Sequence, residues 1–422
     1  SFSNQIWVAS RLEMYYNRDS PVNASILTLF PKMDNHFFDF LPDIFLPGGP
    51  PLKTVGIVAE YNPFHAGHAW HIAQTRQLFQ EETAVVAVMS GNWVQRGECA
   101  IFDKWTRARA ALEGGVDLVL ELPTLWAVSS AEGFARGAVG LLRAAGVVDA
   151  LSFGSESGRL EDLCQAAQAL DSSPGRAALR AELDRGLPFA QARQNALTSV
   201  LGGRADLLRG ANDSLAVEYL RAAEGTLSPI AVLRQGAGHD GGDHPVYPSA
   251  SFLREKIWVG ELPAENPASL RLCERAVLAR LRTMELEDWS ALPDSGGAEG
   301  LPQRLMSAAR AASSLEEFYA LAKTKRYAHA RIRRLALWAF LGLRACDRPA
   351  APTYLRVLSA NGRGRQVLKE MKDRASLPIL TKPAHGRGLL ELEARCTDLY
   401  GLCRRTVPPC GLEWIASPVI LP

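Results

Sequence analysis

The chain has 422 residues, which is more than one typical domain requires. Hydrophobic residues make up 47% of it and charged residues 22%, so it can bury apolar cores and disorder of the whole chain is excluded. The formal net charge is +2, so any nucleic-acid-binding surface has to be a local concentration of positive charge. No apolar run approaches the roughly eighteen residues that cross a bilayer, which predicts a soluble protein.

Seven cysteines are scattered along the chain and form no Cys-x-x-Cys pair. This usage favours reduced thiols over disulfides or a zinc site, and predicts a cytoplasmic location. The first fifty residues also differ from the rest, because they show no clear helical period and end in a proline- and glycine-rich run at 47–51. We expect residues 1–50 to be an extension outside the folded domains.

From residue 54 onward, short apolar runs alternate with helical stretches. The expected strands are Thr54–Tyr61, Thr83–Met89, Val116–Leu122, Val148–Phe153 and Ser228–Leu233. The expected helices between them are Ala66–Gln80, Asp103–Glu113 and Ser129–Ala145, followed by a mostly helical stretch over 159–225. Near-continuous apolar strands in this alternation predict a doubly wound α/β domain with a parallel sheet.

The segment Glu60–His68 (EYNPFHAGH) begins where the first expected strand ends. Ligands of open parallel sheets bind at the carboxyl ends of the strands, where helix N-termini favour phosphate. His65 and His68 would lie on the same side of the first helical turn, and Gly67 would let a nucleotide approach the backbone. This pattern suits attack on the α-phosphate of ATP, in which hydrogen-bond donors stabilise the developing negative charge.

A second candidate site is Ser249–Arg254 (SASFLR), which opens a helix after a glycine-rich loop. Its serine hydroxyls and the guanidinium of Arg254 could bind the same phosphate group. The structural alternatives are an ordinary N-cap for Ser249–Arg254 and a helix cap for the paired histidines. A metal site formed by His65, His68 and His71 is a further alternative.

Taken together, these motifs resemble the HIGH-type nucleotidyltransferase superfamily, and longer segments resemble the tRNA(Met) cytidine acetate ligase family. The matching segments are 56–68 (GIVAEYNPFHAGH), 89–112, 153–156 (FGSE), 249–254, 324–337, 354–368, 377–382 and 397–402. The resemblance extends from about Thr54 to the C-terminus. It implies an ATP-dependent ligase that forms acetyl-adenylate and acetylates N(4) of the wobble cytidine of elongator tRNA(Met).

The resemblance also implies site residues. His65, His68, Ser251 and Arg254 would be catalytic. The ATP-binding positions would be Val58, Ala59, Glu60, Tyr61, Asn62, Pro63, Phe64, His65, Gly67, His68, His71, Gly154, Asn212 and Arg234. We expect ATP to bind with Mg²⁺, and acetate and tRNA(Met) to be the other partners. Residues 54–260 would form the catalytic domain, and residues 261–422 a helical and mixed domain that binds tRNA.

Two further segments bear on the RNA. Six Lys or Arg and no acidic residue fall within 323–334: Lys323, Lys325, Arg326, Arg331, Arg333 and Arg334. The run by itself fits a solvated face or an RNA contact equally well, and the resemblance to the ligase family implies contact with the tRNA backbone. The loop 91–98 could handle a cytosine or cover the adenylate, or it could be a structural loop packed by Trp93. Lys104 and Arg107 could reach phosphate or tRNA, or could be solvated.

Two rival functions share part of this pattern. A small-molecule adenylyltransferase would have both phosphate motifs without needing the basic run. A non-catalytic RNA-binding protein would not need the histidines and Arg254.

Overall fold

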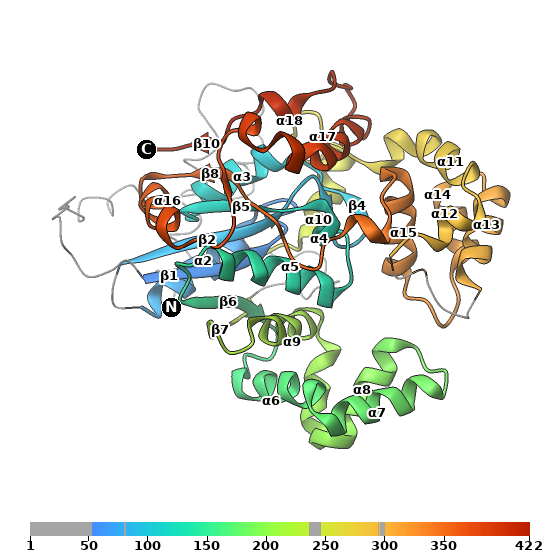
Figure 1. Cartoon of the computed structure of the whole chain (residues 1–422), viewed down its shortest axis with the longest axis horizontal. Coiled ribbons are helices and arrows are strands. Elements are labelled where there is room, and N and C mark those ends of the chain that lie inside the picture. The colour runs from blue at the N-terminus through green and yellow to red at the C-terminus, as the bar shows by residue number, and fades with distance from the viewer. Residues whose placement is uncertain (1–52, 80–81, 236–245, 294, 296–299) are drawn as a thin grey trace.

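The computed structural model describes residues 53–79, 82–235, 246–293, 295 and 300–422. The extension expected at residues 1–50 lies outside these residues. Within them, one eight-stranded sheet forms the centre of the molecule (Figure 1). Its order is β10-β8-β5-β2-β1-β6-β7, with β9 paired to β8. The strands are β1 (Lys53–Ala59), β2 (Thr83–Ser90), β5 (Leu118–Leu122), β6 (Ala150–Ser155), β7 (Ser228–Leu233), β8 (Leu355–Ala360), β9 (Ile379–Leu380) and β10 (Val419–Ile420).

Strands β1, β2, β5, β6 and β7 are mutually parallel, and β8 joins β5 in antiparallel register. The chain builds outward from β1 through β2 to β5, then returns to place β6 on the other side of β1. The order therefore reverses between β1 and β6, and this reversal is where open α/β sheets bind their ligands.

Helices cover both faces of the sheet. Alternate residues of β2 supply two separate cores: Val86 and Val88 belong to one, and Val85 and Ala87 to the other. The first core packs against α5 (Ala131–Ala144), α9 (Ala211–Ala223) and α16 (Gly362–Arg374). The second packs against α2 (Ala66–Gln77) and α3 (Lys104–Glu113). These two layers confirm the expected α/β class.

The expected elements are present with small shifts at their ends. The strand expected over Ser228–Leu233 is β7 with the same bounds. The helices expected from Asp103 and Ser129 begin at Lys104 and Ala131, because the side chains of Asp103 and Ser130 accept hydrogen bonds from the first turn and act as N-caps.

Two helical groups project from the sheet (Figure 1). One, inserted between β6 and α9, consists of α6 (Leu160–Asp171), α7 (Ser173–Asp184), α8 (Phe189–Leu201) and η2 (Gly202–Arg209). The other consists of α11 (Glu274–Arg282), α12 (Leu286–Ser290), α13 (Leu301–Ala311), α14 (Leu315–Ala322) and α15 (His329–Leu341). The chain is completed by α4 (Thr124–Ala127), α10 (Ala250–Trp258), η3 (Leu270–Cys273), η4 (Ala345–Asp347), η5 (Pro383–Gly386), α17 (Arg387–Gly401), α18 (Leu412–Ile415) and the hairpin of β3 (Trp93–Val94) and β4 (Glu98–Cys99). In the part of the chain that the structure describes, no helix is long and apolar enough to cross a membrane.

The sheet draws strands from both of the ranges expected as separate domains. β8, β9 and β10 lie in the C-terminal range and extend the sheet beyond β5. A boundary at residue 260 would therefore cut through the sheet, between β7 and β8 in the sequence. The segment of the C-terminal range that stands apart from the sheet is the helical group α11–α15 (Figure 1).

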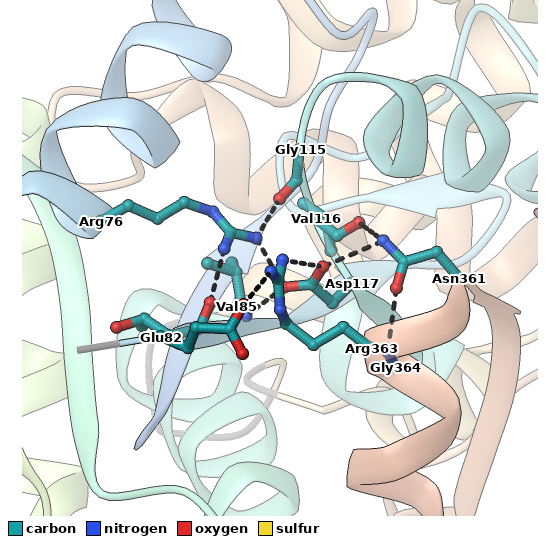
Figure 2. Close-up of polar contacts among 10 residues, drawn as sticks. Arg76, Glu82, Val85, Gly115, Val116, Asp117, Asn361, Arg363 and Gly364 are labelled. Carbon is teal, nitrogen blue, oxygen red and sulfur yellow. Dashed lines mark hydrogen bonds and ion pairs between the residues drawn. The ribbon is translucent and has the colours of Figure 1, made fainter. Parts of the chain in front are cut away.

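A polar network fastens the edge of the sheet at which the parallel strands begin (Figure 2). Its centre is the buried carboxylate of Asp117, which accepts hydrogen bonds from Arg76 (2.6 Å), the Val85 amide (2.7 Å) and Asn361 (2.9 Å). These bonds tie α2, β2 and the start of α16 to β5. The candidate site lies at the opposite end of the parallel strands, where they terminate.

Candidate nucleotide-binding site

A pocket of about 340 Å³ lies at the carboxyl ends of β1, β6 and β7, beside the reversal in strand order. It is lined by the end of β1, the first turns of α2 and α9, the hairpin loop 94–98 and the start of α10. Both predicted phosphate motifs contribute to it: His65, Gly67 and His68 from the first, Ser251 and Arg254 from the second. The two motifs, far apart in the sequence, therefore converge on one cleft.

Both histidine rings accept backbone amides at the start of helix α2. Nδ1 of His65 accepts the Gly67 amide (3.0 Å), and Nδ1 of His68 accepts the His65 amide (3.2 Å). A neutral imidazole whose Nδ1 accepts carries its proton on Nε2. Burial, followed by the charges of Arg234 and Arg254, lowers the pKa of His65 to about 3; burial also lowers the pKa of His68 well below its usual value. Both rings are therefore neutral hydrogen-bond donors, and the same bonds that make them helix caps fix this tautomer.

His71 lies one turn further along α2 and also lines the pocket. Its Nε2 is 2.9 Å from the hydroxyl of Ser152 on β6, and that hydroxyl is 2.7 Å from Thr75 Oγ1. This bond joins α2 to β6 across the point where the sheet order reverses. Among the described residues, no group of three or more His, Cys, Asp or Glu is placed to hold a metal ion.

Helix α10 presents the second motif. The hydroxyl of Ser249 accepts the Phe252 amide (3.1 Å), so this residue is the N-cap that the structural alternative described. Ser251 Oγ accepts a hydrogen bond from Nη2 of Arg254 (3.0 Å), and Nη1 of Arg254 donates to the backbone carbonyl of Asn62 (2.7 Å). The guanidinium is thereby fixed at the pocket wall, next to the strand end that carries the histidines.

The remaining predicted positions divide into two groups. Val58, Ala59, Glu60, Tyr61, Asn62, Gly154, Asn212 and Arg234 line the pocket. Pro63 and Phe64 are not among its lining residues: the Phe64 ring packs on Tyr61, with centroids 5.0 Å apart, and against Gly114, where a Cβ would overlap it. Phe64 thus packs against the apolar core between the sheet and helices α2 and α3, and not into the pocket.

Two acidic residues that were not expected from the sequence form a network beside Asn212. The carboxylate of Glu156 accepts the Asn212 amide (2.9 Å), its side-chain Nδ2 (2.6 Å) and the Asp213 amide (2.7 Å). Although burial raises it, these hydrogen bonds hold the pKa of Glu156 below its usual value. Asp213 in turn accepts the amides of Glu156 and Ser157. Glu156 ends the FGSE segment, in which Gly154 was the one position expected to bind nucleotide.

The hairpin loop has a structural residue and residues that line the pocket. Trp93 is fully buried and donates to the Cys396 carbonyl (3.0 Å), so it is a structural residue. Gln95, Arg96 and Glu98 line the pocket.

Lys104 and Arg107 were expected either to reach phosphate or tRNA or to be solvated. Both are buried inside the protein, which excludes both alternatives. Lys104 Nζ lies 2.7 Å from both Glu121 and Glu413. Arg107 donates to backbone carbonyls, among them that of Glu60 (2.6 Å), and so stiffens the pocket from within.

The basic run lies next to this loop. Lys323, Lys325 and Arg326 are exposed, whereas Arg331, Arg333 and Arg334 are half-buried. Arg333 pairs with Glu98 (2.7 Å), and Arg334 donates to the Gln95 carbonyl (3.4 Å). Part of the run therefore fastens α15 to the wall of the pocket, and the exposed part lies beside it.

Fold and site together define a nucleotidyl transferase. A family model described as HIGH Nucleotidyl Transferase matches residues 52–409. Among solved structures, the chain is similar to TmcAL from Thermotoga maritima in its apo form, with a TM-score of 0.77 and 32% identity over 88% of this chain and 100% of that one. The form "bound with alpha-thio ATP" gives a TM-score of 0.76 at the same identity and coverage.

The curated relatives narrow this class. The chain is 36% identical to a tRNA(Met) cytidine acetate ligase of Clostridium kluyveri, over 88% of this chain and 99% of that protein. It is also 36% identical to the ligase of the same name from Caldanaerobacter subterraneus subsp. tengcongensis, over 87% of this chain and the whole of that protein. The chain belongs to the tRNA(Met) cytidine acetate ligase family.

Proposed function

We propose that this protein activates acetate with ATP as acetyl-adenylate and then acetylates N(4) of the wobble cytidine of elongator tRNA(Met). The observation that carries the proposal is the pocket itself, in which two neutral histidines and the guanidinium of Arg254 face one cavity. The names of the relatives, and the ATP analogue in the similar Thermotoga structure, support the same substrates.

The first step needs electrostatic stabilisation more than proton transfer. Acetate is ionised before it attacks the α-phosphorus, and pyrophosphate leaves as an anion. Nε2–H of His65 and His68 would donate to phosphoryl oxygens, and Arg254 would neutralise the charge that develops there. Ser251 would orient Arg254, because its hydroxyl accepts a hydrogen bond from Nη2 of that residue. Gly154, Asn212 and Arg234 would bind the rest of the nucleotide.

Mg²⁺ would enter with the triphosphate, since this ion binds mainly through substrate phosphates and one or two carboxylates. Of the described residues that line the pocket, Glu60 and Glu98 carry carboxylates, and Glu98 is already paired with Arg333. The chain's own residues therefore supply few ligands for such an ion.

The tRNA would bind along the exposed part of the basic run. Lys323, Lys325 and Arg326 lie next to a helix that contacts the pocket loop, so phosphate contacts there would bring the RNA to the side of the pocket formed by Gln95 and Arg96. The cytoplasm, where tRNA is decoded, is the location that this function requires.

The test measures the two half-reactions separately. Acetate-dependent exchange of pyrophosphate into ATP reports adenylation, and transfer of labelled acetate to tRNA(Met) reports acetylation. Both should occur. Exchange without transfer to any tRNA would point to a small-molecule adenylyltransferase, and tRNA binding without either reaction to a non-catalytic RNA-binding protein.

His68→Ala links this test to the pocket. Removal of one donor should slow exchange by about 10²–10³-fold. Binding of tRNA, measured by filter retention, should stay within about twofold of the unsubstituted protein. Loss of tRNA binding with normal exchange would contradict the assigned role of His68.

A further inference from the structure

The two half-reactions differ in their need for a proton acceptor. In the second, N(4) of cytidine attacks the carbonyl carbon of acetyl-adenylate. A C–N bond forms, the C–O bond to AMP breaks with its electron pair passing to the phosphate oxygen, and N(4) loses one proton. The exocyclic amine is neutral and weakly basic, so a positioned base that takes this proton would accelerate transfer.

The histidines of the pocket are poorly suited to this task. Nδ1 of His65 and of His68 already accepts a backbone amide, and their Nε2 atoms carry protons. The ring of His71 is hydrogen-bonded to the hydroxyl of Ser152. Low pKa values of these rings in the pocket further weaken them as bases.

Two carboxyl groups line the described part of the pocket, those of Glu60 and Glu98. Glu98 is engaged by the guanidinium of Arg333 at 2.7 Å. Glu60 has one oxygen fixed, because Oε1 accepts the Gln95 amide (2.7 Å). Within the described residues, no donor is bonded to its other oxygen, Oε2.

The backbone holds Glu60 in place. It directly follows β1, at the carboxyl ends of the parallel strands. Its backbone carbonyl accepts a hydrogen bond from Nη1 of the buried Arg107 (2.6 Å). The Gln95 amide that holds Oε1 belongs to the loop contacted by Arg334 of the basic run. Glu60 thus lies between the nucleotide motifs and the side from which RNA would arrive.

Burial raises the pKa of the Glu60 carboxyl, while the Gln95 amide and the charges of Arg96, Arg254 and Arg107 oppose this rise. A raised value makes a carboxylate a stronger base near neutral pH. The charged and titratable groups that face it come from the hairpin loop (Arg96), α3 (Arg107), α9 (Tyr219) and α10 (Arg254).

We propose that Glu60 is the general base of acetyl transfer, its Oε2 accepting the proton that N(4) of cytidine loses as the C–N bond forms. This inference rests on the proposed function. It assigns to Glu60 a role in the second half-reaction beyond membership of the nucleotide-binding stretch.

The test is Glu60→Gln in the full chain, with each half-reaction measured. The amide keeps the shape of the side chain and an acceptor for the Gln95 amide, but it does not take up a proton near neutral pH. We expect acetate-dependent exchange to fall much less than transfer, because the amide keeps the shape of the pocket wall. Single-turnover transfer from acetyl-adenylate to tRNA(Met) should slow by about 10²-fold or more.

Two further measurements separate a base from a structural residue. Transfer by the unsubstituted protein should rise with pH through one ionisation above the usual range of glutamate, and Glu60→Gln should lack this rise. Glu60→Asp, which retains a carboxylate, should transfer faster than Glu60→Gln. Glu82→Gln is the matched control, because Glu82 is exposed at the opposite edge of the sheet (Figure 2), and it should leave both rates unchanged.

An equal transfer rate in Glu60→Gln would overturn the proposal and leave the AMP phosphate as the proton acceptor. Parallel loss of exchange and transfer would also overturn it, because Glu60 would then serve nucleotide binding. Failure of the proposed function is distinguishable, since in that case the unsubstituted protein itself would lack exchange or transfer.

Discussion

The guanidinium of Arg254 donates a 2.7 Å hydrogen bond to the backbone carbonyl of Asn62, across 192 residues of sequence. Asn62 in turn uses its side-chain Oδ1 to accept the Ile101 amide (2.8 Å). One short chain of bonds therefore connects α10, the end of β1 and the segment after the hairpin. Protein groups alone hold the two phosphate motifs together, which reduces the reorganisation needed in the reaction.

Arg254→Ala should slow acetate-dependent exchange by about 10²–10³-fold, because a fixed charge and a connection between motifs are lost together. Arg254→Lys should recover only part of the rate. The lysine restores the positive charge, but one ammonium group cannot bond Ser251 and Asn62 in the fork geometry of a guanidinium. Steady-state exchange kinetics would measure both.

Lys256→Ala is the control on the same helix. Its ammonium group pairs with Glu261 at the surface, and removal of such a pair changes little. If Arg254→Ala and Lys256→Ala behaved alike, Arg254 would have no special part in adenylation.

The half-buried histidines of the pocket should make the folded protein sensitive to acid. Burial, and then the charge of Arg234, lowers the pKa of His71 to about 4, against about 6.5 in an unfolded chain. The unfolded state therefore takes up the proton first, so this stability is present above about pH 6.5 and is lost as the pH falls toward 4. The urea midpoint should be lower at pH 5 than at pH 7.5.

His71→Asn should narrow this difference between the two pH values, because the neutral amide has no proton to take up. Gln77→Ala, exposed on the same helix, should leave the difference unchanged. A His71→Asn protein with the original pH dependence would show that another group controls it.

Gly97→Ala should destabilise the contact between the hairpin and α15. Gly97 has a φ of +75°, and a Cβ there would lie 2.5 Å from backbone atoms of Arg333 and Arg334. Left-handed backbone costs a non-glycine residue about 1–2 kcal/mol, and the overlap would add about 1–3 kcal/mol. Denaturant unfolding would measure the loss.

Gly342→Ala separates the two terms. Gly342 also has left-handed backbone, with φ +66° and ψ 32°, but nothing lies within 4 Å of a Cβ placed there. It should lower the free energy of unfolding by the smaller backbone term alone. Equal losses in the two variants would argue against a tight contact at Gly97.

The exposed part of the basic run should control tRNA affinity. Lys323→Ala, Lys325→Ala and Arg326→Ala combined should weaken binding by about tenfold or more and reduce the salt slope by up to about 3, since each phosphate contact contributes about 0.9. Acetyl-adenylate formation should be unchanged. Titrations at several salt concentrations would test this.

The matched control removes three exposed cations from α16, Arg365, Lys369 and Lys372, at the other edge of the sheet. An equal loss of affinity in both triple variants would show that general positive charge, and not this surface, binds the RNA. Arg333 is kept in both because its bond to Glu98 supports the pocket loop.

Local patterns in the sequence were sufficient for much of the architecture. The apolar runs gave the five parallel strands, because a strand buried on both faces has few polar residues. The N-caps Asp103, Ser130 and Ser249 lie within a residue or two of the expected helix starts, because capping involves neighbours in sequence. The His-x-Gly-His and Ser-x-Ser-x-x-Arg spacings likewise indicated two groups that could hold phosphate.

Tertiary structure decided which side chains those groups would meet. Charge alone left Lys104 facing either phosphate or solvent, yet it lies between Glu121 and Glu413, partners supplied by distant segments. The run Leu355–Ala360 looks like a buried strand, but its antiparallel place beside β5 depends on the path of the chain between them. Glu156 orients Asn212 only because the fold brings these two distant residues into hydrogen-bonding contact. Burial and long-range pairing set these outcomes, because the free energy of a charged or polar group depends on its neighbours in space, and a linear pattern specifies neighbours in sequence.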